Sequence, residues 1–331
     1  MAAATLDVVG IGNAIVDVLA HADDGFLATH GLAKGTMTLI DAARADALYA
    51  VMGPAIEASG GSAGNTMAGI ASLGGRGAYI GKVRDDQLGE VFRHDITAIG
   101  VAFATAPATS GPPTARCLIL VTPDAHRTMQ TFLGACVDLG PEDIDEAVIA
   151  AAQVTYLEGY LFDPPRAKAA FRKAAELAHG AGRRVSLSLS DPFCVGRHRA
   201  EFRELVAHHV DILFANEAEI CSLYETDDFD AAARRVREDC DVAALTRSEK
   251  GSVVVAREHT HLIEAAKVGR LVDTTGAGDL YASGFLFGLT QGRDLATCGR
   301  LGSLCAAEAI GHFGARPEEP LAALAHRAGL V

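Results

Sequence analysis

The sequence has fewer basic than acidic residues, no pair of cysteines at C-x-x-C spacing and no long apolar run. Its 29 Lys and Arg residues stand against 42 Asp and Glu residues, so the formal net charge is −13. This balance argues against a nucleic-acid partner, because such proteins need clustered basic side chains. No stretch approaches the ~18 consecutive apolar residues of a membrane helix, so we also expect no membrane partner.

The cysteines and the first residues predict where the protein is found. An odd number of cysteines, seven, without zinc-binding spacing is typical of reduced thiols in the cytosol. The opening segment, MAAATLDVVGIGNAIVD, lacks the basic region that precedes the apolar part of a signal peptide. We therefore expect a cytoplasmic protein.

Short β-rich runs alternate with alanine-rich helical stretches along the central part of the chain. With 49% hydrophobic residues among 331, the chain can form a large core. The alternation predicts an α/β fold in which a mainly parallel sheet carries helices on both faces, as a single domain over residues 1–331. Segments at about 18–40 and 105–133 show hairpin-like patterns instead, and we expect them to form a small β-sheet lid within this domain.

Polar segments follow the predicted strands at one edge of the sheet. They read GNAIVD, YLEGY, SLSDPF, FANEAE, LTRSEKG and DTTGAGD in chain order. In open parallel sheets, ligands bind beyond the carboxyl ends of the strands. This shared position predicts one functional site built from all six segments.

The segment DTTGAGD, residues 273–279, lies between a predicted strand at 268–272 and a predicted helix. Gly276 and Gly278 permit a tight turn whose N–H groups, together with the helix start, form an anion site. Asp279 would repel an anion, but it suits a base that takes a proton from a hydroxyl attacking a phosphoryl group. The alternative is an aspartate that complements the helix dipole, and this stretch alone leaves both open.

Three further polar clusters also allow a structural and a functional interpretation. GNAIVD is either a solvated turn or a segment whose polar side chains bind vicinal hydroxyls of a ligand. GGSAGN is either a flexible loop with a helix cap or a place where a ligand approaches the backbone. NEAE is a capping box that could also organise Mg²⁺ and its waters. The residues concerned are Asn13, Asp17, Gly60, Gly61, Ser62, Asn65, Asn216 and Glu219.

Together these segments resemble the PfkB (ribokinase-like) family of carbohydrate and nucleoside kinases, and most closely its adenosine kinase branch. DTTGAGD matches the family's C-terminal pattern at every position, and GGSAGNTMAGIASLGG resembles the N-terminal pattern; the resemblance covers residues from about 6 to 318. It implies a ribokinase-like three-layer α/β/α core with a mainly parallel central sheet and a small β-sheet lid. It also implies transfer of a phosphoryl group from ATP to an alcohol.

The resemblance further implies roles for individual residues. Asp279 would be the general base, and the backbone of Gly276, Ala277 and Gly278 would be the anion hole. ATP and Mg²⁺ would bind at Asn216, Glu219, Thr246, Ser248 and Gly251, and K⁺ would lie near Asp273 and Thr275. The substrate would be bound by Asn13, Asp17, Gly60, Gly61, Ser62, Asn65, Arg127, Met129, Leu133, Glu158, Tyr160 and Phe193.

The likeness to the adenosine kinase branch favours the 5′-hydroxyl of a nucleoside, adenosine first, as the acceptor. An apolar slot formed by Leu133, Phe193 and Tyr160 suits a purine better than a free sugar. Glu158 favours the alternative, a sugar kinase acting on a ribose- or fructose-type acceptor, because sugar kinases of the family carry a carboxylate there. A non-catalytic nucleoside-binding protein is a weaker alternative, since a pure binder needs no base at Asp279. The sequence leaves monomer and homodimer open.

Overall fold

The larger part of the molecule is built around a nine-stranded sheet. The computed structural model describes residues 3–124 and 126–331, so residues 1 and 2 of the predicted domain and residue 125 of the predicted lid lie outside the described residues. The strands are β1 (Leu6–Ile11), β5 (Gly77–Ile80), β6 (Val101–Phe103), β9 (Ala152–Glu158), β10 (Arg184–Ser188), β11 (Ile212–Asn216), β12 (Val242–Thr246), β13 (Ser252–Ala256) and β14 (Thr260–Ile263). Their order across the sheet is β14-β13-β12-β11-β10-β9-β1-β5-β6. All neighbours pair in parallel except β12 with β13 and β13 with β14.

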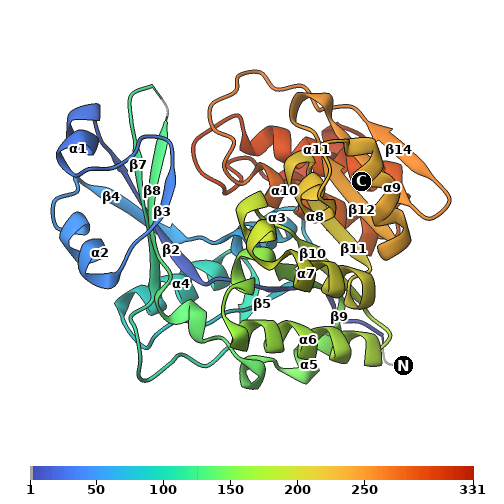
Figure 1. Cartoon of the computed structure of the whole chain (residues 1–331), viewed down its shortest axis with the longest axis horizontal. Coiled ribbons are helices and arrows are strands. Elements are labelled where there is room, and N and C mark those ends of the chain that lie inside the picture. Colours follow the sequence, from blue (N-terminus) through green and yellow to red (C-terminus); the bar gives the residue numbers. More distant parts are fainter. Residues whose placement is uncertain (1–2, 125) are drawn as a thin grey trace.

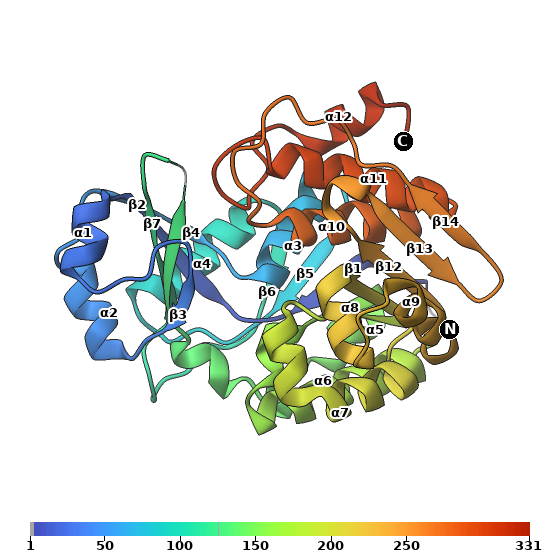
Figure 2. The same ribbon diagram turned by 45° about the horizontal axis from the view of Figure 1, so that its top comes forward.

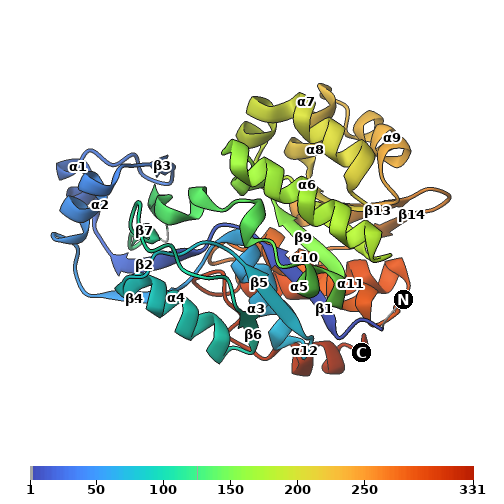
Figure 3. The same ribbon diagram turned by 90° about the horizontal axis from the view of Figure 1, so that it is seen from below.

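Helices cover both faces of this sheet, as Figure 3 shows. One face carries α3 (Ser62–Ser72), α4 (Gln87–Ala98), α10 (Ala277–Thr290), α11 (Leu295–Ala309) and α12 (Leu321–Arg327). The other carries α5 (Glu146–Ala151), α6 (Pro165–Gly180), α7 (Pro192–His209), α8 (Glu217–Tyr224) and α9 (Phe229–Asp239). Successive strand residues feed opposite layers, since Val8 packs with the first group and Val9 with the second. Among the described helices, none combines the length and apolarity required to cross a membrane.

A second, five-stranded sheet forms the lid, drawn at the left of Figures 1 and 2. It consists of β2 (Ile15–His21), β3 (Met37–Leu39), β4 (Ala55–Ser59), β7 (Ala115–Val121) and β8 (Arg127–Phe132), and it carries α1 (Asp24–Thr29) and α2 (Ala42–Tyr49). The strand order is β3-β8-β7-β2-β4. The hairpin predicted within 105–133 is present, because β7 and β8 pair antiparallel.

The other part of the lid differs from the expectation. Residues 18–40 do not form a hairpin: β2 pairs with β4 and β7, β3 pairs with β8, and α1 lies between them in the chain. Strand β4 was also not predicted from the sequence. Its first residues, Ala55 and Ile56, are exposed at the edge of the sheet, so they lack the buried alternation that predicts a strand.

The period of two along the lid strands gives the lid two distinct faces. Val18 and Leu118 belong to the same buried cluster as Leu27 of α1 and Leu48 of α2. The alternate residues Ile15, Cys117, Ile119, Met129 and Thr131 line a cavity on the opposite face. The lid therefore presents a mainly apolar surface to whatever enters that cavity.

The strand predicted at 268–272 is absent. This segment has no regular secondary structure and joins its neighbours through hydrogen bonds from the N–H of Val272 and, more weakly, that of Asp273 to the carbonyl of Ile310, 2.9 and 3.4 Å long. It leads directly into the DTTGAGD turn, so that turn reaches the edge of the sheet from a loop rather than from a strand. Short 3₁₀ helices complete the chain: η1 (Gly134–Asp138), η2 (Pro141–Asp143), η3 (Gly159–Phe162) and η4 (Ser248–Lys250).

Candidate active site

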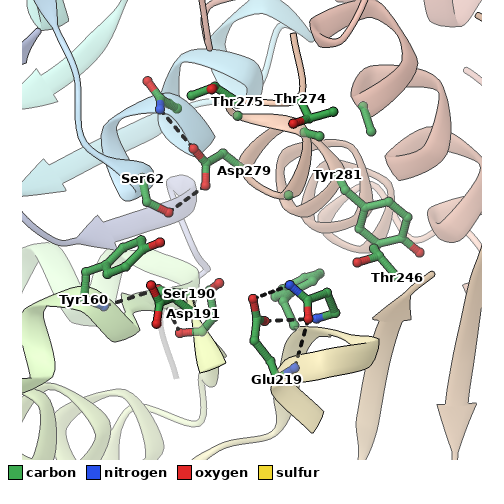
Figure 4. A pocket seen from close by; sticks show the side chains of 18 of the residues that line it. Ser62, Tyr160, Ser190, Asp191, Glu219, Thr246, Thr274, Thr275, Asp279 and Tyr281 are labelled. Carbon is green, nitrogen blue, oxygen red and sulfur yellow. Dashed lines mark hydrogen bonds between the residues drawn. The ribbon is translucent and has the colours of Figure 1, made fainter. Parts of the chain in front are cut away.

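A cavity of about 1400 Å³ lies between the inner face of the lid and the carboxyl ends of the parallel strands. Figure 4 shows Ser62, Tyr160, Glu219 and Asp279, which come from α3, η3, α8 and α10, around this cavity. Most of the residues singled out from the sequence line this cavity: Asn13, Asp17, Gly61, Ser62, Asn65, Met129, Leu133, Glu158, Tyr160, Phe193, Asn216, Glu219, Thr246, Ser248, Gly251, Thr275, Gly276, Ala277, Gly278 and Asp279. Gly60, Arg127 and Asp273 are not part of the lining: Gly60 lies against the Asp17 carboxylate, Asp273 accepts from the Thr275 N–H, and Arg127 pairs with Asp273.

The DTTGAGD segment forms a tight turn that starts α10. Gly276 has φ 78°, in the left-handed region, and a Cβ there would lie 2.5 Å from the Cβ of Ala315. Only glycine is therefore compatible with both its backbone and its surroundings. The N–H groups of the first helical turn follow immediately, and that of Ala277 donates weakly to the Thr274 carbonyl (3.3 Å). Because N–H groups at a helix start attract anions, we call residues 276–278 the anion turn.

Asp273, the first aspartate of the segment, holds this turn in place. Its carboxylate accepts hydrogen bonds from the N–H groups of Thr275 (3.0 Å) and Gly314 (3.2 Å). It also forms an ion pair, 2.9 Å long, with Arg127 at the start of β8, and both side chains are almost fully buried. Arg127 thus ties the lid to the anion turn. A monovalent cation near Asp273 and Thr275 stays a prediction.

Asp279 lies in the first turn of α10 and faces α3 across the cavity (Figure 4). Its two carboxylate oxygens accept hydrogen bonds from Ser62 Oγ (2.6 Å) and Asn65 Nδ2 (2.9 Å). Burial raises the pKa of Asp279, and these two hydrogen bonds counter part of that rise. Asn65 Oδ1 is buried without a partner, so it can accept a hydrogen bond from a bound hydroxyl.

Glu158, at the end of β9, organises the loop that follows β1. Its carboxylate accepts hydrogen bonds from Asn13 Nδ2 (2.7 Å), the N–H of Asn13 (3.3 Å) and the N–H of Ala63 (2.8 Å). The side chain is 1% exposed, and burial raises its pKa to about 7. Glu158 therefore fixes Asn13 and the start of α3 relative to each other.

The glycines before α3 allow Asp17 and the loop after β1 to lie close to this helix. A Cβ on Gly60 would meet the Asp17 carboxylate at 2.3 Å. Gly61 has φ 81°, and its Cβ would lie 2.2 Å from the Asn13 carbonyl oxygen. Burial raises the pKa of Asp17 to about 6, while the positive charges of Arg316 and Arg127 act in the opposite direction. This end of the cavity thus gathers polar groups suited to hydroxyls.

The lid end of the cavity is apolar and is flanked by two aromatic side chains. Met129 and Leu133 lie on the inner face of the lid. Phe193 at the start of α7 is 78% exposed and Tyr160 in η3 is 38% exposed, although both line the cavity. The Phe193 ring in particular has little packing of its own, which leaves its faces available to a flat ligand.

The opposite end of the cavity carries the NEAE segment and the turn after β12. Asn216 and Glu219 form a full capping box at the start of α8: the Asn216 side chain accepts from the Glu219 N–H, and the Glu219 side chain accepts from the Asn216 N–H. Burial raises the pKa of Glu219 to about 7. Thr246, Ser248 and Gly251 border the same end, in the turn that joins β12 to β13.

Some residues of the site were not identified from the sequence. Asp191 caps α7 by accepting from the N–H groups of Phe193 and Cys194, and the Asp-Pro pair at a helix start could have indicated it. Ser190, with φ 68°, is a strained residue that accepts a hydrogen bond from the Tyr160 N–H. Arg316 contacts the loop before α3 and has no local sequence pattern that marks it.

Comparisons with known proteins identify the family of the chain. The family model described as "pfkB family carbohydrate kinase" matches residues 55–321. The chain belongs to the pfkB family. It is 28% identical to an adenosine kinase of Saccharomyces cerevisiae over 332 residues, which covers 94% of this chain and 96% of that protein.

Two solved structures are similar over nearly the whole chain. An adenosine kinase from Sinorhizobium meliloti is 58% identical with a TM-score of 0.91, covering 98% of this chain and 100% of that one. A probable sugar kinase from Rhizobium etli CFN 42 is 53% identical with a TM-score of 0.93, covering 99% of this chain and 100% of that one. The predicted ribokinase-like fold is confirmed, and so is the predicted resemblance to the pfkB family and its adenosine kinases. The chain is a phosphotransferase that uses ATP and acts on an alcohol group of a nucleoside or sugar.

The buried carboxylate of Glu158 predicts a pH-dependent stability of the free protein. Unfolded Glu158 loses its proton near pH 4.5, whereas the folded side chain keeps it up to about pH 7. The free energy of unfolding therefore falls as the pH rises through this window, by roughly 1–3 kcal/mol for this group. In Glu158→Gln this contribution is absent, so urea unfolding at pH 5.5 and pH 8 should show a smaller difference than in the wild type.

Glu176→Gln is the matched control for this experiment, because it removes the same charge from an exposed position on α6. It should keep the wild-type difference between the two pH values. Equal pH dependence in Glu158→Gln and Glu176→Gln would contradict the assigned environment of Glu158.

Proposed function

We propose that this protein phosphorylates the 5′-hydroxyl of a nucleoside, with adenosine as the preferred acceptor and ATP as the phosphoryl donor. The observation that carries the proposal is the placement of Asp279. Its carboxylate, held by Ser62 and Asn65, stands next to the anion turn of residues 276–278 and in the same cavity as the apolar face of the lid. A base, an anion site and an apolar slot in one cavity are what this transfer requires.

In the proposed reaction, each part of the cavity has one task. Asp279 takes the proton from the attacking hydroxyl. The N–H groups at Gly276, Ala277 and Gly278 hold the oxygens of the transferring phosphoryl group, where negative charge develops. The lid excludes water, so that ATP is not hydrolysed instead.

The residues at the nucleotide end fit a magnesium ion bound together with ATP. Asn216 and Glu219 offer oxygen ligands, which Mg²⁺ prefers. Burial and the negative charges of Asp191 and Asp279 raise the pKa of Glu219. A cation bound there would therefore relieve the repulsion between these carboxylates. No group of three or more His, Cys, Asp or Glu side chains suited to a metal occurs in residues 3–124 and 126–331, so phosphate oxygens and water would supply most ligands. When bound, the ion neutralises charge on the phosphate oxygens. Thr246, Ser248 and Gly251 would border the nucleotide.

The acceptor would occupy the other half of the cavity. Its hydroxyls would meet Asn13, Asp17 and Asn65, while Gly60 and Gly61 let it approach the backbone. The base would lie between Met129, Leu133 and the rings of Tyr160 and Phe193, and the adenosine kinases among the similar proteins support this choice. The ion pair of Arg127 with Asp273 places its charge beside the anion turn, where it would help to hold phosphate.

A sugar kinase is the second candidate. Glu158 supports it as a carboxylate lining the acceptor end, and the similar protein from Rhizobium etli is named a probable sugar kinase. Against it, three protein N–H groups already occupy the Glu158 carboxylate, and the lid face is apolar, whereas a free sugar needs polar contacts on all sides.

Replacing Asp279 by Asn should separate binding from catalysis. The amide keeps the size of the side chain but cannot accept the proton, so kcat should fall by ~10²–10⁴ while the Kd for ATP changes little. The control is Asp7→Asn, which alters another buried aspartate outside the cavity lining. The Asp7 carboxylate accepts a hydrogen bond, 2.8 Å long, from the Arg76 N–H. Near-normal turnover in Asp279→Asn would remove Asp279 from the mechanism.

The acceptor can be identified by ADP release with Mg·ATP and a panel of adenosine, inosine, guanosine, cytidine, ribose and fructose. We expect the highest kcat/KM for adenosine, and a selective loss for the nucleosides when Leu133 is replaced by Ser, because this substitution makes the base slot polar. A preference for ribose or fructose would instead support the sugar kinase alternative.

A further inference from the structure

Arg316 joins the end of the chain to the loop that starts α3. It lies after α11, and its side chain is partly buried. Nε and Nη2 donate to the carbonyl of Ser59 (3.1 and 2.5 Å), Nη2 also donates to Ser59 Oγ (2.8 Å), and Nη1 donates to the carbonyl of Gly64 (2.8 Å). The planar guanidinium thus uses different nitrogens to bridge two backbone positions that flank the glycine pair of the site.

Asp95 of α4 holds the same loop from another direction. One of its carboxylate oxygens accepts from both the N–H (2.8 Å) and the Oγ (2.5 Å) of Ser59. Ser59 is the last residue of lid strand β4, and Gly64 lies in the first turn of α3. Arg316 and Asp95 therefore fix the point at which the chain leaves the lid and enters the core.

The segment fixed in this way carries both side chains that bind the Asp279 carboxylate. Ser62 lies between the two clamped carbonyls, and Asn65 follows directly after the second. A shift of this loop would move both hydrogen-bond donors away from Asp279 at once. Arg316 also contributes positive charge, which opposes the effect of burial on the pKa of Asp17 and of Asp279.

We propose that Arg316 is a positioning residue for phosphoryl transfer: its guanidinium fixes residues 59–64 so that Ser62 and Asn65 orient the Asp279 carboxylate toward the acceptor hydroxyl. The inference rests on the proposed function. All hydrogen bonds described for Arg316 go to Ser59 and Gly64, so we expect its effect to be confined to the acceptor half of the cavity. Displacements of about 1 Å at a reacting centre can reduce rates ~10²-fold.

Arg316→Gln removes the guanidinium group and its hydrogen bonds to Ser59 and Gly64 but keeps a polar side chain. We expect kcat to fall ~10–100-fold, the KM for adenosine to rise and the KM for ATP to stay within about twofold of the wild type, because the nucleotide end is unchanged. Hydrogen exchange of residues 59–66 should become faster, since the loop loses its clamp.

Arg93→Gln is the matched control. Arg93 also donates to two backbone carbonyls, those of Phe103 (2.9 Å) and Thr105 (2.8 Å), but outside the cavity. This variant should lose comparable stability while kcat and the exchange of residues 59–66 stay as in the wild type. The proposal would be overturned if Arg93→Gln and Arg316→Gln lowered kcat equally. It would also be overturned if Arg316→Gln weakened the binding of ATP as much as that of adenosine.

A second variant covers the case in which Arg316→Gln does not fold. Ser59→Ala removes only the hydroxyl between Arg316 and Asp95, and it should lower kcat ~2–10-fold with faster exchange of residues 59–66; wild-type values for both would overturn the proposal. The exchange measurement needs no turnover. If the wild type phosphorylates no acceptor, the proposed function fails, whereas unchanged exchange in Arg316→Gln refutes the clamp.

Discussion

The contact between Asp279 and α3 is the interaction on which the site depends. It joins two segments more than two hundred residues apart, because the carboxylate of α10 accepts hydrogen bonds from Ser62 and Asn65. Burying a carboxylate is unfavourable unless donors compensate it. Here the donors come from α3, so the position of that helix and the ionisation of Asp279 are linked. The glycines before α3 and the turn before α10 bring the two helix starts close enough for this contact.

Asp279 is one of four buried carboxylates that line the cavity. Asp17, Glu158, Glu219 and Asp279 all have raised pKa values, each with burial as the largest cause. Such a group of carboxylates lowers the stability of the free protein near neutral pH, as expected for a site selected for function rather than for stability. Two of them, Glu158 and Glu219, also have structural tasks, since they fix the loop after β1 and the start of α8. Ligands that bring hydroxyls or cations would relieve this repulsion.

Much of the fold and of the candidate site followed from local patterns. The DTTGAGD turn could be predicted because only glycine fits its φ of 78° and its contact with Ala315. The alternation of strands and helices predicted the layered core, and the hairpin-like pattern within 105–133 predicted the β7–β8 hairpin. The capping box of Asn216 and Glu219 was also apparent from their spacing.

The features that were missed depend on contacts distant in sequence. Strand β4 has no buried period of its own and forms only because β2 offers it an edge. Residues 268–272 have an apolar, strand-like composition, but they meet a loop instead of a strand. Arg316 contacts residues 252 and 257 positions earlier, so no local pattern indicates its partners.

The most direct test of this account is a crystal structure of the protein with adenosine and a non-hydrolysable ATP analogue. We predict that the 5′-oxygen of adenosine lies within hydrogen-bond distance of the Asp279 carboxylate. We also predict that the γ-phosphate lies over the N–H groups of residues 276–278, with the base between Leu133 and Phe193. An adenosine bound elsewhere, or with its 5′-oxygen turned away from Asp279, would contradict the proposed role of this residue as the base.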